Sequence, residues 1–211
     1  MSVRVGLVDS GLGPEHRAVA AVQVPAHGVL MPVRPDAGGH GADMARIILA
    51  QAPEAELVLA QVFDGEAATS PARVAAGLEW CVTQGAQVIA LCLGLRRDEP
   101  VLRAACAKAA AAGVDLIASA AARGAAVYPA AYDEVISVCG DARCAPGEVS
   151  ALGGVPAEFG ACHVWGQRRG ASCAAASVAG LVAAWRARGG SGQARAYLSK
   201  MAAYHGREHR T

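Results

Sequence analysis

The stretch VRVGLVDSG, residues 3–11, decides the fold of this chain. Residues 3–8 form a short, nearly continuous apolar run, which is typical of a β-strand that is covered on both faces. Asp9 follows directly, and Gly11 allows the chain to turn sharply. Because ligand sites in parallel sheets lie where the strands end, this stretch predicts a parallel sheet with a carboxylate at its functional edge.

Four later runs have the same character as this first strand, and helical patterns separate them. The further strands are expected at 56–62, 87–93, 114–120 and 134–139, and the helices at 41–51, 70–84, 98–112 and 172–188. Residues typical of helix ends mark two of these helices. Ser70-Pro71 begins one and Gly85 ends it, and Asp98 begins another and Gly113 ends it. The alternation predicts an α/β fold, a three-layer doubly wound mainly parallel sheet.

The chain of 211 residues is long enough for one full domain. We expect that domain to cover residues 1–190, followed by a C-terminal helix and polar tail over 191–211. Segment 121–169 is rich in glycine, proline and alanine, and we interpret it as loops over the carboxyl edge of the sheet with one strand embedded. His205 and His209 could bind a metal, but YHGREHRT, residues 204–211, is better interpreted as a frayed, solvated tail.

Composition excludes several classes of partner. Hydrophobic residues make up 54% of the chain and charged residues 18%, and 19 Lys and Arg nearly balance 18 Asp and Glu. We therefore expect no binding to nucleic acid or to an anionic membrane. The seven cysteines form no CxxC pair, which favours a reduced, cytoplasmic chain without a zinc site. No stretch is long enough to span a bilayer, and the N-terminus does not look like a secretion signal.

Ser172 lies in RRGASCAAASVAGLVAAW, residues 168–185, at the start of an apolar helix. It could simply cap the helix, or it could be a nucleophile whose oxyanion is stabilised by N–H groups of the helix start. A nucleophile needs a base and an acid that orients the base. His40, which stands between glycines at a helix start, and Asp9 offer these groups, although each alone could be a cap, a turn former or a solvated residue.

Taken together, three motifs resemble those of the subtilisin-type serine proteases, the subtilases. VGLVDSG resembles the family's Asp motif, HGADMARII its His motif, and GASCAAASVAG its Ser motif. The segments SPARVAAGLEWCVTQGAQVIALCLG and YPAAYDEVISV resemble the family's helix with its substrate-binding strand and a further stretch before the serine. The resemblance covers residues 3–188.

The resemblance implies peptide-bond hydrolysis without a cofactor or a metal. Ser172 Oγ would attack the carbonyl, His40 would carry the proton, and Asp9 would fix the imidazole tautomer. The backbone N–H of Ser172 would donate to the oxyanion, and the peptide would extend along residues 92–94. The substrate-binding residues implied by the resemblance are Cys92, Leu93, Gly94, Ser119, Ala120, Ala121 and Val127.

Several residues depart from the family pattern. Ala122 stands where the family has the Asn that donates to the oxyanion, a loss that costs on the order of 10² to 10³ in turnover. Either the enzyme is slow, or Arg123 or a donor supplied by a partner compensates. Val127 replaces a common Gly beside the primary specificity pocket, which predicts a narrow pocket for a small residue. Ala171 and Ala176 replace Thr and Pro, which the start of the helix tolerates.

These features predict a small processing protease. We expect an intracellular enzyme that needs neither calcium nor self-cleavage and that removes a leader peptide from a precursor, with other maturation enzymes as further partners. Small subtilases of this outline occur in bacterial peptide-maturation systems, one of which matures the crosslinked small subunit of quinohemoprotein amine dehydrogenase, and that role is one candidate here. The alternative is a catalytically weak or inactive binding module that holds a precursor peptide for another enzyme. Cys92 and Cys173 lie beside the cleft by resemblance and are interpreted as packing residues.

Overall fold

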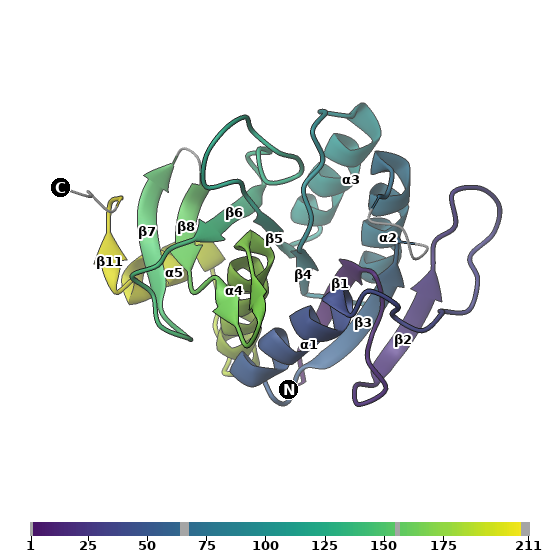
Figure 1. The fold of residues 1–211 in the computed structure, drawn as a ribbon, viewed down its shortest axis with the longest axis horizontal. Coiled ribbons are helices and arrows are strands. Elements are labelled where there is room, and N and C mark those ends of the chain that lie inside the picture. The colour runs from purple at the N-terminus through teal and green to yellow at the C-terminus, as the bar shows by residue number, and fades with distance from the viewer. Residues whose placement is uncertain (1, 64–67, 155–156, 208–211) are drawn as a thin grey trace.

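Figure 1 shows the computed structural model of the chain, which describes residues 2–63, 68–154 and 157–207. Within these residues one nine-stranded sheet runs through the molecule, and helices cover both of its faces. All neighbouring strands are parallel except β7 (Val149–Gly154) and β8 (Ala157–Ala161). The predicted α/β fold with a doubly wound, mainly parallel sheet is confirmed.

The strand order places the first strand inside the sheet. From edge to edge the strands are β11 (Tyr204–His205), β7, β8, β6 (Val135–Gly140), β5 (Asp115–Ser119), β4 (Val88–Leu91), β1 (Arg4–Asp9), β3 (Glu56–Gln61) and β2 (Ala18–Gln23). A separate antiparallel pair, β9 (Val164–Trp165) and β10 (Arg168–Arg169), precedes the last long helix. Because β1 pairs with both β3 and β4, Asp9 lies at the sheet's carboxyl edge with a neighbouring strand on each side.

Two hydrophobic clusters fill the space between the sheet and its two helical layers. The helices are α1 (His40–Gln51), α2 (Pro71–Thr83), α3 (Pro100–Ala111), α4 (Ala171–Ala187) and α5 (Ala194–Met201). Helices α1, α4 and α5 pack on one face and α2 and α3 on the other (Figure 1). Leu7 of β1 joins the first cluster and Val8 the second, because successive strand residues point to opposite faces.

Helix α4 is built of small residues and therefore lies very close to α1. A Cβ atom on Gly180 would stand 2.7 Å from the carbonyl oxygen of Ile48, so the two helices meet at their backbones. Residues 173–180 are all buried. This contact fixes the helix that begins beside Ser172 against the helix that begins at His40.

The helix predictions agree with the structure to within two residues at each end. Ser70 caps α2, since its hydroxyl accepts from the Arg73 N–H at 3.3 Å. The predicted start of the third helix at Asp98 is wrong, because the cap residue is Glu99. Asp98 instead accepts from the Tyr132 hydroxyl at 2.9 Å.

The interpretation of segment 121–169 as loops with one strand is wrong. Besides β6 it contains β7, β8, β9 and β10, and the sequence analysis also missed β2. These strands are short, half-exposed or broken by glycines, so they lack the continuous apolar runs that marked the others.

The C-terminal residues are only partly a tail. Tyr204–His205 pair with β7 as β11, and the Arg143 guanidinium lies over the Tyr204 ring at 5.1 Å, so the prediction of a frayed end is wrong for these residues. His209, the second half of the suggested metal pair, lies outside the described residues. None of the described helices is both long enough and apolar enough to cross a membrane.

Candidate active site

Asp9 and His40 are brought together at the carboxyl edge of the sheet. Asp9 ends β1 with only 1% of its surface exposed, and His40 is the first residue of α1. The His40 Nδ1 atom lies 2.7 Å from Asp9 Oδ1, so a protonated Nδ1 donates to the carboxylate. Burial alone would lower the pKa of His40, but the hydrogen bond and charge of Asp9 outweigh it and raise that pKa above 6.5.

The start of α1 is fixed against the turn that follows Asp9. The Gly41 N–H donates to the Ser10 hydroxyl at 3.0 Å, and a Cβ on Gly41 would stand 2.2 Å from the carbonyl oxygen of Gly11. Only glycine fits here, because the helix backbone rests directly on the turn. The glycine after His40 therefore sets the distance between the imidazole and Asp9.

Asp36 is a residue of this site that the sequence analysis missed. Its two carboxylate oxygens accept from the N–H groups of Gly39 and Ala42, each at 3.0 Å. These bonds satisfy two of the free donors at the start of α1 and place a negative charge at the positive end of the helix. An Asp a few residues before a helix start is the signal that could have revealed it.

Ser172 is the second residue of α4, and the cap interpretation is wrong. The cap residue is Gly170, at φ 148°, and no side chain caps this helix. Among the described residues the Ser172 N–H has no acceptor, as expected in a first helical turn, and it can therefore bind an oxygen of a ligand. No hydrogen bond joins His40 to Ser172 within the described part of the chain, so the third member of the triad stays a prediction.

An ion pair connects the helix of His40 with the segment that leads to Ser172. Arg168 Nε in β10 contacts Asp43 Oδ2 in the first turn of α1, and both side chains are partly buried. The positive charge of Arg168 also acts on the pKa of His40, in the lowering direction. The sequence analysis did not identify this contact, because Asp43 and Arg168 are 125 residues apart in the chain.

Cys92 and Cys173 are buried packing residues. Burial raises the pKa of the Cys92 thiol well above its ordinary value, and the charges of Asp9 and of Cys173 act in the same direction. Burial also raises the pKa of Cys173. Both thiols are therefore protonated near neutral pH and are poor nucleophiles, and all seven cysteines of the chain are free.

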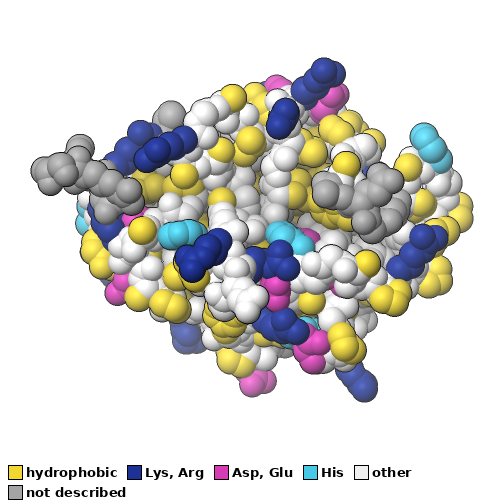
Figure 2. Space-filling model, in the orientation of Figure 1, with side chains coloured by type: hydrophobic (Ala, Val, Ile, Leu, Met, Phe, Trp, Pro, Cys, Tyr) yellow, Lys and Arg dark blue, Asp and Glu magenta, His cyan; other side chains and the backbone are white. Residues whose placement is uncertain are grey.

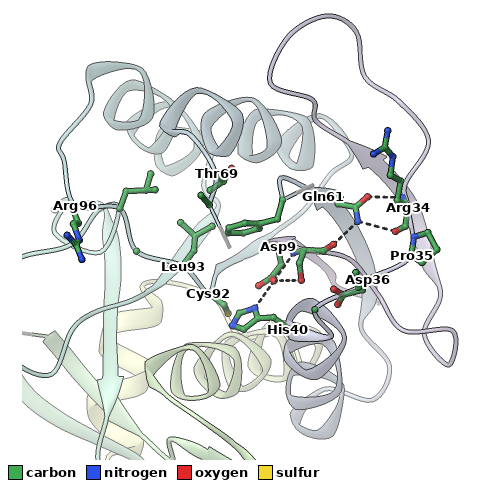
Figure 3. Close-up of a pocket in the computed structure, with 17 residues that line it drawn as sticks. Asp9, Arg34, Pro35, Asp36, His40, Gln61, Thr69, Cys92, Leu93 and Arg96 are labelled. Carbon is green, nitrogen blue, oxygen red and sulfur yellow. Dashed lines mark hydrogen bonds and ion pairs between the residues drawn. The ribbon is translucent and has the colours of Figure 1, made fainter. Parts of the chain in front are cut away.

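Three cavities are lined by most of the predicted substrate-binding residues, and Ser172 lines none of the three. A cavity of about 1030 Å³, which we call the first cavity, is lined by Asp9, His40 and residues 92–96 (Figure 3). A second cavity of about 380 Å³ is lined by Ala120, Ala121 and Val127. A third cavity of about 590 Å³ is lined by Ala122, Arg123, Gly170 and Ala171.

Ser119 lines none of these three cavities. It is buried at the end of β5, and its hydroxyl has no partner among the described residues.

The side chain of Val127 packs closely against the backbone of residues 93–95. A Cβ on Gly94 would stand 3.3 Å from the Val127 Cβ, which is tighter than ordinary contact. The backbones are joined by two hydrogen bonds between Leu95 and Tyr128, at 2.7 and 2.8 Å. The side chain of Val127 is therefore held firmly against this edge.

The part of the chain that the structure describes contains no group of three or more His, Cys, Asp or Glu arranged to hold a metal ion.

A sequence comparison relates the chain to a known protein family. A model of the Subtilase family matches residues 2–161, a range that includes Asp9 and His40 and ends before Ser172. Subtilisin DY of Bacillus licheniformis is 28% identical over an alignment 152 positions long, which covers 65% of this chain and 56% of that protein. The chain thus spans little more than half the length of this relative.

Solved structures share the fold. The crystal structure of a lanthipeptide protease superposes with a TM-score of 0.69 at 22% identity, covering 94% of this chain and 78% of that one. The prenylagaramide maturation protease PagA superposes with a TM-score of 0.67 at 19% identity, covering 92% and 80%.

Proposed function

The chain belongs to the subtilase family, and on that premise we propose that it is a serine endopeptidase that acts through Asp9, His40 and Ser172. Ser172 Oγ attacks the scissile carbonyl, and His40 Nε2 takes its proton and returns it to the leaving amine. Asp9 holds the imidazole and stabilises its charged form.

The contact between Asp9 and His40 is the observation that carries this proposal. A carboxylate that is 99% buried has lost most of its hydration, which is costly unless hydrogen bonds replace it. Here Oδ1 accepts from the imidazole at 2.7 Å and from the Ser10 N–H at 2.7 Å, while the buried Oδ2 has no partner among the described residues. With Nδ1 bound to Asp9, Nε2 is the nitrogen left to act as the base.

The oxyanion would be stabilised by two groups from different elements. The first is the N–H of Ser172, which has no acceptor among the described residues. The second is the guanidinium of Arg123, because the methyl group of Ala122 cannot donate and Arg123 lines the same cavity as Gly170 and Ala171. A guanidinium gives a charge-assisted hydrogen bond, which is stronger than that of the amide it replaces.

We assign the substrate to the class of precursor peptides. A lanthipeptide protease and the prenylagaramide maturation protease PagA share the fold over more than nine-tenths of this chain. The peptide would add to the edge at residues 92–94, and Val127 would restrict the residue before the scissile bond to a small side chain. The cut would release a leader segment, in the cytoplasm and without a cofactor.

A second function is favoured by two features of the site. No hydrogen bond joins His40 and Ser172 among the described residues, and Ala122 replaces an oxyanion donor. Both would suit a module that binds a precursor peptide and leaves it intact for another enzyme.

Cleavage of a mixed synthetic peptide library, followed by mass spectrometry, separates the two functions. We expect the wild-type protein to cut, Ser172→Ala to be inactive, and Ser177→Ala to cut normally. Ser177 is a matched control because it lies in the same helix and its buried hydroxyl has no partner among the described residues. Peptides that bind to the wild type but emerge intact would favour the binding module.

A further inference from the structure

Four arginines line the two cavities on either side of the site. Arg34 and Arg96 line the first cavity, and Figure 3 shows them at its opposite ends with no interaction drawn to either guanidinium. Arg123 and Arg207 line the third cavity. Within the described residues, none of these four side chains forms a hydrogen bond or an ion pair, although arginines elsewhere do, as Arg186 does with Asp115 at 2.8 Å.

The carboxylates in the same cavities are already bound by groups of the protein. Asp9 accepts from His40, and both oxygens of Asp36 accept backbone N–H groups. Asp141 is held by Arg143 at 2.7 Å and by the Ser150 hydroxyl at 2.6 Å. Although burial alone would raise it, these bonds lower the pKa of Asp141 to about 2.

We use the word groove for the first and third cavities together. The formal charges of its arginines and acids nearly balance, but within the described residues the four guanidinium groups have no ion pair, whereas the acids accept hydrogen bonds from protein groups, apart from the buried Oδ2 of Asp9. Figure 2 shows Lys and Arg side chains in the middle of this face, with Asp and Glu side chains beside some of them. Arginines that have no ion pair among the described residues can bind anionic groups of a ligand through charge-assisted hydrogen bonds.

We propose that the groove selects an acidic peptide, with Asp or Glu residues on both sides of the bond presented to Ser172. The carboxylates on one side face Arg34 and Arg96, and those on the other side face Arg123 and Arg207. This inference rests on the proposed function for its substrate, but it concerns binding and can be measured without cleavage. Each exposed carboxylate–arginine contact changes affinity by roughly two- to fivefold, and the effect decreases with salt.

The test uses two fluorescein-labelled, alanine-rich peptides and the Ser172→Ala protein, which cannot cut them. One peptide carries two Glu residues on each side of a central Ala-Ala bond, and the other carries Gln at the same places. By fluorescence anisotropy at low salt we expect the Glu peptide to bind about tenfold more tightly, and this preference to decrease at high salt. Equal binding of the two peptides, tighter binding of the Gln peptide, or no measurable binding of either would overturn the proposal.

Charge-reversal variants show which arginines cause the preference for the Glu peptide. Arg96→Glu and Arg207→Glu, each added to Ser172→Ala, should reduce the preference for Glu to about twofold or less. Arg188→Glu is the matched control, because this exposed arginine stands at the far end of α4, about 25 Å from its start. An equal loss with Arg188→Glu would show a nonspecific effect of net charge and contradict the assignment to the groove.

Cleavage by the wild-type protein is measured in parallel. Binding of the Glu peptide without cleavage would refute the endopeptidase and leave the acidic groove standing. Cleavage of both peptides at equal efficiency, with equal affinity, would refute the acidic groove and leave the endopeptidase standing.

Discussion

Replacing Gly41 by alanine tests how the site is assembled. In the native structure a Cβ at this position would stand 2.2 Å from the carbonyl oxygen of Gly11, and real Cβ atoms essentially never approach closer than 3.0 Å. The start of α1 must therefore move from the turn by about 0.8 Å or more. Because His40 precedes Gly41 and Asp9 lies in the strand before the turn, this movement separates the imidazole from the carboxylate.

The expected magnitude follows from that displacement. The distance between His40 Nδ1 and Asp9 Oδ1 is 2.7 Å, and an added 0.8 Å or so brings it to the outer limit of a hydrogen bond. Forcing an extra methyl group into a close contact costs about 1–3 kcal/mol of folding free energy. A misplacement of about 1 Å in catalytic geometry costs on the order of 10² in rate. We therefore expect a folded, moderately destabilised protein with about 1% of normal activity.

Three measurements check this prediction: urea unfolding, the cleavage rate on a library peptide, and the ¹H NMR signal of the His40 Nδ1 proton. Gly38→Ala is the control, since its Cβ would have no neighbour closer than 4.0 Å. We expect the control to behave as the wild type. If Gly41→Ala kept the wild-type rate and an unchanged Nδ1 signal, the argument that this glycine sets the distance between Asp9 and His40 would be refuted.

Three further substitutions probe the site. Asp9→Asn should lower activity by about 10⁴. It should also move the acid limb of the pH–rate profile to lower pH, because His40 works as a neutral base and its raised pKa depends on the Asp9 charge. An acid limb at the wild-type pH would contradict this. Arg168→Gln should shift the same limb to higher pH, because it removes a positive charge that lowers the pKa of His40; an unshifted limb would show that this charge does not act on the imidazole. Val127→Gly should improve cleavage after a large residue by roughly tenfold relative to a small one, and unchanged selectivity in peptide assays would exclude Val127 as the wall of that pocket.

The sequence predicted the centre of the fold well because local signals and tertiary structure agree there. A continuous apolar run marks β1, and the Asp9 that ends it lies at the sheet edge, as the pattern of parallel strands requires. Ser70 caps its helix as its residue type and position indicated. In each case the residues of one short segment were enough to determine the local structure.

The features that the sequence did not reveal depend on residues far apart in the chain. Asp43 and Arg168 meet only after α1 and β10 have been placed, and no local pattern pairs them. Strand β11 has two residues and exists because β7 offers it an edge. The charge of the groove likewise depends on which acids have acquired partners in the folded chain, as Asp141 has with Arg143.

Labelling by a serine-directed fluorophosphonate tests the central claim most directly, because only an activated hydroxyl reacts. We predict that the wild-type protein is labelled at Ser172, as located by peptide mass spectrometry, that Ser172→Ala is not labelled, and that His40→Ala reacts much more slowly. A folded wild-type protein that remains unlabelled, or one that is labelled equally fast after His40→Ala, would contradict the account.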